Sequence, residues 1–313
     1  MQYSIYSVSH LSFMASASVK GYFEITTGCI IYGMVGVFLV LINDMGTLPI
    51  MFYKLLIGVI FLAGYVYLTG KMDLIRIKGK RKQLLLLGIF KLLTIYFYFT
   101  CILYSGLSIA ILLLYTAPMY VTVFSPFVLK EMPIRLGIVG LFLSMAGIVL
   151  IVDPSNLVGL GLGDMHFVGL ISGILSGISF SFLIMTARYL RDEYSGFAQF
   201  FWATIFCVIV LLPFASDVTV PVLKGNFMIL LLFGVVNTSI SGVLYFSGLS
   251  KVRTQTASIL AMLEPVSGIF FDYALLHSAI FAETLIGCVF IIAGALLAVM
   301  GTMSFRKHPE FET

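Results

Sequence analysis

The sequence predicts an all-α integral membrane protein with ten transmembrane helices, arranged as two inverted five-helix repeats. Three observations support this prediction: an apolar composition, the placement of basic residues between long apolar runs, and an internal repeat. Of 313 residues, 60% are hydrophobic and 10% are charged, whereas about 25% are charged in an ordinary soluble domain. Only helices and closed barrels satisfy the backbone in lipid. The long apolar runs favour helices, because barrel strands alternate in polarity.

A hydrocarbon core about 30 Å thick requires about 20 helical residues. Cutting the chain at charged clusters and at Gly, Pro and Asn breaks gives ten segments near that length. We expect spans at 21–43, 46–69, 83–105, 107–129, 133–152, 165–188, 196–214, 226–248, 254–276 and 279–303. These spans form a first repeat over 21–152 and a second over 165–303, flanked by cytoplasmic tails at 1–20 and 304–313.

The positions of Lys and Arg test the number of spans, because these residues accumulate in cytoplasmic loops. With the N-terminus inside, 15 of the 18 fall in inner segments, Lys224 falls in an outer loop, and Lys54 and Lys91 fall within spans. A wrong number of spans would exchange the two sides and remove this asymmetry. The sequence therefore predicts a multi-pass protein of the plasma membrane with both termini in the cytoplasm.

The cysteines and histidines predict neither a disulfide framework nor a metal site. All four cysteines lie in apolar runs, where thiols usually pack as small apolar groups, and the four histidines are scattered without ligand spacing. No Gly-x-x-x-x-Gly-Lys-Ser/Thr loop occurs, so we expect no ATP hydrolysis. We expect no cofactor and no nucleic-acid partner. The expected partners are the lipid bilayer and a small-molecule substrate.

An internal repeat relates the two halves of the chain. A shift of 147 residues aligns 98–152 with 245–299 without a gap and gives 12 identities in 55 positions, among them Tyr98 with Tyr245. Because five helices is an odd number, the second half enters the membrane from the opposite side. Such inverted repeats are typical of secondary transporters, whose substrate site lies near the midplane between the halves. A symmetric bundle without carrier function is the alternative.

Glu264 is the eleventh of 23 residues in the ninth predicted span and lies near the midplane. A charge there costs about 2.5 to 3.5 kcal/mol on insertion scales. The carboxylate either lines a polar cavity, where it binds a cationic group or a proton, or stays neutral and bonds backbone groups freed by Pro265. Pro118 and Pro265 occupy repeat-related mid-span positions, where proline breaks helical hydrogen bonding. They predict fixed kinks or hinges.

Lys54 and Lys91 lie about three residues from the middle of their spans, which leaves about 10 Å to the nearest interface by helix rise. A lysine side chain covers only about 6 Å, so we expect both ammonium groups to face protein or water. Each is a candidate partner for Glu264 or for an anionic substrate. The alternative is a tilted helix from which the lysine reaches the headgroups.

Several mid-span polar side chains are candidates for substrate binding, although packing is the alternative for each. A phenol combines an apolar face with a hydrogen-bonding group, which suits an amphipathic substrate. The candidates are Tyr32, Tyr98, Tyr115, Tyr245 and Asn237. Tyr98 and Tyr245 are related by the repeat, so we expect that they can face each other. For Asn237, a hydrogen bond between helices is the alternative.

Small residues recur in the fifth and tenth predicted spans, at Gly137, Gly140, Ser144, Gly147, Gly287, Gly294 and Ala298. They permit close helix contact, either within the bundle or at the seam of a homodimer. Asp272 and Glu283 border the short outer hairpin between the last two spans, so we expect both to be solvated.

From about residue 21 to 303, the sequence resembles the EamA-type branch of the drug/metabolite transporter superfamily. The resemblance rests on Tyr32-Gly33, Lys54, the run from Ala110 to Pro118, Leu129-Lys130-Glu131, Leu263-Glu264-Pro265 and the run from Gly287 to Gly294. It implies a two-repeat carrier of metabolites, often amino acids or related compounds and usually an exporter. Ser278 departs from the pattern, since the family normally has Glu near the start of the last helix.

These observations together predict a secondary active transporter that exports a small amphipathic metabolite by alternating access, and that is not an enzyme. Proton exchange at Glu264 would supply the driving force. The alternatives are a membrane-embedded enzyme and a channel. An enzyme would require clustered His, Asp or Ser groups at one depth of the bilayer, and the sparse ionisable residues of this sequence do not suggest one.

Overall fold

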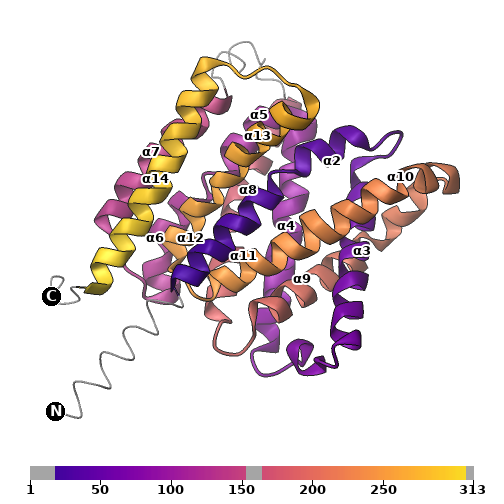
Figure 1. The fold of residues 1–313 in the computed structure, drawn as a ribbon, viewed down its shortest axis with the longest axis horizontal. Coiled ribbons are helices and arrows are strands. Elements are labelled where there is room, and N and C mark those ends of the chain that lie inside the picture. Colours follow the sequence, from indigo (N-terminus) through magenta and orange to yellow (C-terminus); the bar gives the residue numbers. More distant parts are fainter. Residues whose placement is uncertain (1–17, 153–163, 308–313) are drawn as a thin grey trace.

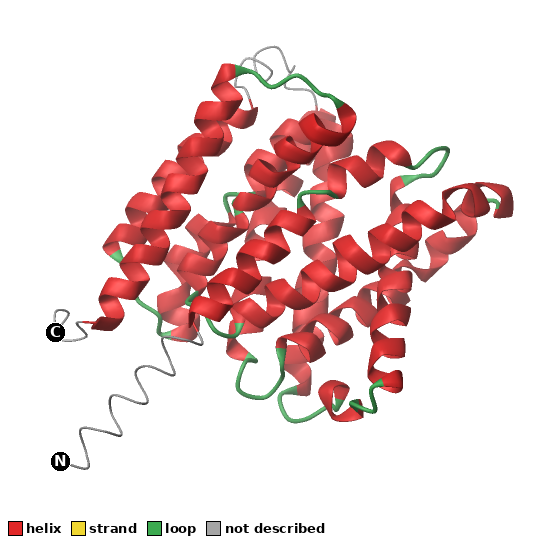
Figure 2. Ribbon diagram, in the orientation of Figure 1, coloured by secondary structure: helices red, strands yellow, loops and turns green. Residues whose placement is uncertain are grey.

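The computed structural model describes residues 18–152 and 164–307, and every regular element in these residues is helical (Figure 2). Within them, ten segments are long and apolar enough to cross a membrane, as the sequence predicts. They are Ser18–Leu41, Thr47–Leu68, Arg81–Ser105, Leu107–Leu129, Arg135–Val152, Met165–Tyr189, Gly196–Asp217, Val220–Leu249, Thr254–Leu276 and Ala282–Phe305. The predicted tails lie mostly outside the described residues, and their described parts, 18–20 and 304–307, continue the first and last helices.

Several of these spans consist of more than one helix (Figure 1). After a first helix over residues 18–32 come α2 (Val35–Leu41), α3 (Thr47–Leu68), α4 (Arg81–Ser105), α5 (Leu107–Leu114), α6 (Ala117–Leu129), α7 (Arg135–Val152), α8 (Asp164–Tyr189), α9 (Gly196–Leu211), α10 (Val220–Leu232), the π-helix η4 (Phe233–Ile240), α11 (Ser241–Leu249), α12 (Thr254–Ala261), α13 (Leu263–Leu276) and α14 (Ala282–Lys307). Two short 3₁₀ segments, η1 (Met72–Ile75) and η3 (Leu212–Asp217), lie between spans or at their ends.

The fourth and ninth spans are broken at repeat-related positions. Helix α5 ends in a cap at Tyr115, and helix α12 ends in a cap at Met262, which the 147-residue shift aligns with Tyr115. Pro118 and Pro265 each lie in the first turn of the following half-helix, where a backbone N–H has no helical partner to lose. The breaks therefore precede the prolines, rather than falling at them.

The first and eighth spans are irregular where they meet. The first helix ends in a turn at Gly33 and Met34, which leaves carbonyl groups without helical partners. The side-chain amide of Asn237, in the π-helix η4, donates to the Ile31 carbonyl at 2.7 Å and to the Tyr32 carbonyl at 3.1 Å. This is the interhelical role that the sequence leaves open for Asn237. Such π segments are often found at functional sites.

The inverted repeat is visible in the turns that end α6 and α13. Lys130 and His277 are repeat-related caps in the left-handed conformation, with φ of 57° and 55°. In each turn the next backbone N–H donates to a carbonyl six residues earlier, at 3.3 Å: Glu131 to Ser125, and Ser278 to Asp272. The same local structure therefore ends α6 at one end of the bundle and α13 at the other (Figure 1).

Helices α7 and α14 lie side by side along most of their length (Figure 1). A Cβ atom at Gly140 would lie 2.4 Å from the Gly294 carbonyl oxygen, and one at Gly147 would lie 2.5 Å from the Gly287 carbonyl oxygen. The small residues of the fifth and tenth spans thus pack within the bundle. A homodimer through these glycine faces would compete with that packing.

We expect Gly140→Val to destabilise the protein by about 1 to 3 kcal/mol, because the added side chain meets backbone that cannot move aside. Thermal unfolding in detergent measures the loss. The matched control is Gly64→Val, at a helical position where an added Cβ would meet nothing within 4 Å. Equal melting temperatures for the two variants would contradict the close packing of α7 on α14.

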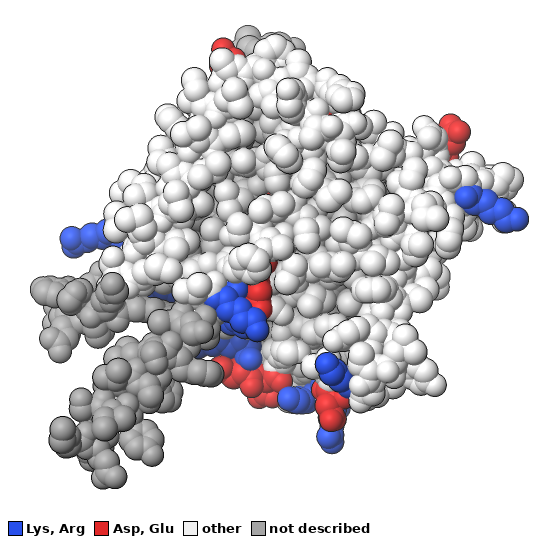
Figure 3. All heavy atoms as spheres, in the orientation of Figure 1, with Lys and Arg blue, Asp and Glu red and all other residues white. Residues whose placement is uncertain are grey.

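Charged residues gather at one end of the bundle, which we call the basic end and define by Lys71, Arg76, Lys130, Arg191 and Lys251. Figure 3 shows most of the blue and red spheres on this face along its lower edge, below a nearly uncharged belt. A belt of this kind suits contact with lipid. All ion pairs between described residues lie at the basic end.

Candidate functional site

A cavity of about 430 Å³ lies between the two repeats. Every side chain that the sequence predicts to bind substrate lines it: Tyr32, Lys54, Lys91, Tyr98, Tyr115, Asn237, Tyr245 and Glu264. Pro265 lines it as well, whereas Pro118 is buried away from it. The structure thus brings together residues from both halves of the chain, and their role in binding stays a prediction.

Glu264 and Tyr115 lie beside the two helix breaks, and both line the cavity. Glu264 occupies the first turn of α13, and Tyr115 is the residue that caps the end of α5. Among the described residues, no basic nitrogen lies within 4.0 Å of this carboxyl group. The group is therefore positioned to bind a proton or a cationic ligand.

Lys91 and Lys54 have different surroundings. The Lys91 ammonium donates to the Thr204 hydroxyl at 2.6 Å and lies 4.0 Å from the centre of the Phe200 ring. The Lys54 ammonium lies 4.4 Å from the centre of the Phe233 ring, and no described oxygen is within hydrogen-bonding distance of it. Neither lysine forms the ion pair with Glu264 that the sequence leaves open.

The tyrosines contribute both apolar surface and hydroxyl groups to the cavity. Tyr245 packs edge-on against Tyr32, with ring centres 6.2 Å apart. It makes no ring contact with Tyr98 in the described part of the chain, but both side chains line the cavity, so their facing each other across it stays a prediction. The hydroxyl of Tyr245 is buried and has no partner among the described residues. A bound ligand or water can satisfy it.

Many other residues line the cavity without having been predicted to do so, and Cys29, Thr238 and Asp272 are among them. Asp272 was expected to be solvated, but one of its carboxyl oxygens is buried without a hydrogen-bond partner among the described residues, and the residue lines the cavity. A position near the end of a span predicts contact with water, so the sequence did not indicate this burial. In the structure, the Asp272 carboxyl group lies next to Gly36 of the first span. Glu283 is exposed, as expected.

The cavity extends from the middle of the bundle to the end opposite the basic end. There it is lined by Leu39 of α2, Leu107 of α5, Ile151 of α7 and Asp272 of α13, all near the ends of their helices at that side. At the basic end, polar contacts join the two repeats, and none of the residues that make them lines the cavity. We therefore describe the site as a pocket that is closed at the basic end.

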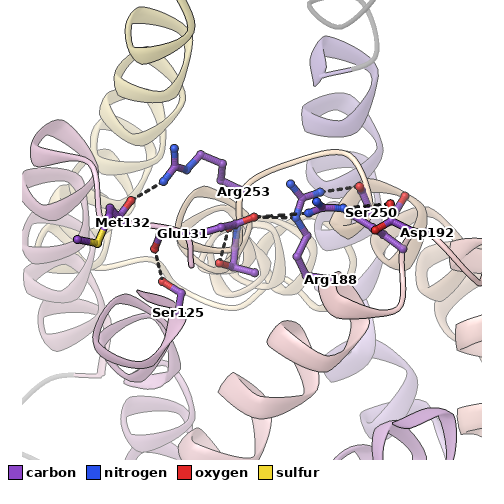
Figure 4. A network of polar contacts seen from close by, with 9 residues as sticks. Ser125, Glu131, Met132, Arg188, Asp192, Ser250 and Arg253 are labelled. Atoms are coloured by element: carbon purple, nitrogen blue, oxygen red, sulfur yellow. Dashed lines mark hydrogen bonds and ion pairs between the residues drawn. The ribbon is translucent and has the colours of Figure 1, made fainter. Parts of the chain in front are cut away.

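Glu131 is the centre of these contacts (Figure 4). It follows α6 and accepts from the Arg188 guanidinium of α8 at 3.0 Å. Its other carboxylate oxygen accepts both from the Thr254 hydroxyl and from the Thr254 backbone N–H, each at 2.9 Å. Arg191 adds a longer ion pair at 3.7 Å. Glu131 of the first repeat therefore caps helix α12 of the second, and favourable helix-dipole interaction adds to the bond.

The ionisation of Glu131 is set by this environment. Burial disfavours the charged form, but the charge of Arg188 and the hydrogen bonds from Arg188 and Thr254 outweigh it. Together they hold the pKa of the Glu131 carboxyl below its ordinary value of 4.5. At neutral pH the contact is therefore an ion pair. Its repeat-related position at the other end is Ser278, which cannot form one.

Other bonds between the repeats reinforce this closed end. Lys251 pairs with Glu24 of the first helix, and Arg253 donates to the Met132 carbonyl. The Tyr194 hydroxyl donates to the Gly79 carbonyl at 2.6 Å, and the Trp202 indole N–H donates to the Ile75 carbonyl at 2.9 Å. None of these partners are near in sequence, so no local pattern could have revealed them.

The chemistry of the described residues offers no metal centre, since no group of three or more His, Cys, Asp or Glu among them is placed to hold an ion. The cavity instead combines two ammonium groups, one midplane carboxyl group, phenols and apolar walls. This arrangement can bind a small molecule that carries both charge and apolar surface.

Comparison with known proteins identifies the family. The model of the EamA-like transporter family matches residues 19–153 and again residues 167–300. An uncharacterized transporter of Archaeoglobus fulgidus is 28% identical over 279 residues, which cover 88% of this chain and 94% of that protein. The uncharacterized transporter YxxF of Bacillus subtilis is 24% identical over 277 residues, which cover 87% and 86% of the two chains.

A solved crystal structure has the same fold, with a TM-score of 0.75 at 15% sequence identity, covering 91% of this chain and 98% of the other. The two family matches correspond to the two halves that the internal repeat relates. The chain therefore belongs to the EamA-like transporter family, and it is a multi-pass membrane transporter.

Proposed function

We propose that this protein is a secondary active transporter that exports a small amphipathic metabolite, such as an amino acid or a related compound, by alternating access. One observation carries the proposal: a cavity between inverted repeats, with charged groups at mid-depth, reaches one end of the bundle and is closed at the other by the contacts of Glu131. A carrier needs a site of this kind, exposed to one side at a time.

The position of the basic residues indicates the side of the membrane to which the cavity opens. Because Lys and Arg accumulate on the cytoplasmic side, the basic end is assigned to the cytoplasm, with both termini there and the cavity open to the outside of the plasma membrane. An exporter in this state has released its substrate. Glu264 is the group proposed to exchange a proton for substrate, because among the described residues that line the cavity it has the one carboxyl group near mid-depth.

Counterflow in proteoliposomes tests the function. A thermal-shift screen of amino acids and related amphipathic compounds supplies ligands, and each ligand is then loaded into liposomes with its tracer outside. We expect saturable tracer uptake that is stimulated by unlabelled ligand on the other side. Flux that neither saturates nor responds to ligand on the other side would indicate a channel. Chemical conversion of the ligand would indicate an enzyme.

A further inference from the structure

We propose that the substrate carries a carboxylate and that Lys54 is the residue that recognises it. This inference rests on the proposed transport function and makes its substrate class more specific. The cavity contains two lysines, but only one is already engaged. Lys91 donates to Thr204 and lies against Phe200, so its hydrogen-bonding and ring contacts are made by the protein itself.

Lys54 lacks such contacts. Its ammonium lies on the face of the Phe233 ring, and no described oxygen accepts a hydrogen bond from it. An ammonium group inside a membrane protein is costly unless it is paired or hydrogen-bonded. Lys54 lines the cavity, and Phe233 fixes the position of its charge. An anionic group entering the cavity would complete this site.

A second donor without a partner among the described residues also lines the cavity. The hydroxyl of Thr238 in the π-helix η4 is buried and has no partner among the described residues. Thr238 packs against α3 one turn from Lys54, because its methyl group lies 3.2 Å from where a Cβ atom of Gly58 would be. A carboxylate has two oxygens and matches an ammonium group with a hydroxyl group nearby.

The remaining charges of the cavity agree with an anionic ligand group at this position. Glu264 shares the cavity with Lys54, but the two form no ion pair in the described part of the chain. Asp272 lies eight residues further along the same span, about 12 Å towards the mouth by helix rise. The deep part of the cavity therefore holds two cationic groups and one carboxyl group, which favours a ligand with an acidic end.

The other walls define the rest of the ligand. The lining is dominated by aliphatic and aromatic side chains, including Leu55, Ile95, Phe99, Ile111 and Phe180. These surfaces suit an apolar body of modest size. The substrate class is thus a small organic acid with an apolar body, and it includes amphipathic amino acids because they carry the same carboxylate.

Matched ligands test the proposal with the purified, full-length protein. The probes are 3-phenylpropionate and 4-methylvalerate, their uncharged amides, and the cation 2-phenylethylamine, each measured by calorimetry and by thermal shift. We expect each acid to bind at least about tenfold more tightly than its amide, the size of effect that a charge-assisted hydrogen bond gives. Amides binding as well as acids, binding of the amine alone, or no binding of either acid at millimolar concentration would overturn it.

Variants assign the effect to Lys54. Lys54→Met should remove the acid-over-amide preference and leave the affinity for amides unchanged, while Lys54→Arg should keep the preference. Lys224→Met is the matched control, because that lysine is exposed on α10 and does not line the cavity, and it should keep the preference. A preference that survives in Lys54→Met, or that is lost equally in Lys224→Met, would overturn the assignment. Without ligand, Lys54→Met should have a melting temperature no lower than that of the wild type, and this result would show that the variant folds.

The same set of variants separates this proposal from the proposed function. If the acids bind through Lys54 but show no counterflow, the carboxylate site stands and the carrier function is wrong. If counterflow occurs only with amides or amines, the carrier function stands and the carboxylate site is wrong.

Discussion

Replacement of Glu131 with Gln should open the basic end of the protein. The side chain keeps its size but loses the charge that faces Arg188 and weakens the cap of α12. Removing one partner of a largely buried ion pair typically costs about 3 to 5 kcal/mol. The Glu131 and Arg188 side chains are 15% and 10% exposed, so solvent screens this pair only slightly. A loss of this size would move a closed state to a mixture of open and closed states.

The rate at which Cys29 is labelled measures this opening, because Cys29 lines the cavity and is only 1% exposed in the closed structure. With the other three cysteines replaced by alanine, a membrane-impermeant thiol reagent is applied to the basic side of oriented proteoliposomes. We expect labelling of Cys29 in Glu131→Gln to be at least about tenfold faster than in the wild type, since tenfold corresponds to about 1.4 kcal/mol. The matched control is Asp192→Asn, which removes an exposed ion pair with Arg191 at the same end and should change nothing.

Acid should have the same effect on the wild-type protein. Because the closed state holds the pKa of Glu131 below 4.5, its contribution to closure is complete above that value and is lost as the pH falls through the lowered pKa. Emission from Trp202, the single tryptophan, reports on the basic end through its bond to Ile75. It should stay constant from about pH 8 to about pH 5 and shift to the red below about pH 4. A shift centred near pH 7 would contradict the role of Glu131.

Replacement of Glu264 with Gln should abolish proton-driven accumulation of substrate while leaving counterflow intact. The amide keeps the size and shape of the carboxyl group but cannot exchange a proton. A gradient of one pH unit sustains up to about tenfold accumulation for each proton exchanged, since tenfold is about 1.4 kcal/mol. We expect that accumulation to fall to the equilibrium value in the variant.

The measurement uses the tightest-binding organic acid of the ligand panel in proteoliposomes with an imposed pH gradient. Glu283→Gln is the matched control, because this glutamate is exposed at the start of α14 and does not line the cavity. It should transport like the wild type. A Glu264→Gln protein that retained the full pH dependence would show that another group carries the proton.

The ten spans could be predicted from the sequence because composition and the position of each charge constrain their bounds strongly. The ninth span was predicted at 254–276 and is observed at Thr254–Leu276. Its break at Met262 was less predictable. Pro265 indicates that the helix is interrupted, but proline is accepted in the first turn of a helix, so the interruption falls three residues earlier.

The cavity residues could be predicted because charged groups near the midplane are costly, so Lys54, Lys91 and Glu264 had to face a polar interior. The different surroundings of Lys54 and Lys91 could not be predicted. They depend on Thr204 and Phe200, which are more than a hundred residues from Lys91 in the chain.

The contacts that close the basic end could not be predicted from the sequence either, because their partners are also far apart in the chain. Glu131 lies 57 residues from Arg188 and 123 residues from Thr254, and no local pattern links them. The sequence did indicate an asymmetry, because Ser278 occupies the repeat-related position. The structure explains this asymmetry. Equivalent turns end α6 and α13, but only the turn at Glu131 has a carboxylate that can bond the two repeats together.

Alternating access by two inverted repeats is tested most directly by paired distances between spin labels in lipid. One pair, at Met132 and Asp192, spans the basic end, and the other, at Val40 and Leu107, spans the mouth of the cavity; all four residues are exposed. Addition of a transported ligand should lengthen the first distance and shorten the second in the same molecules. Both distances unchanged, or both longer together, would contradict a carrier that opens to one side at a time.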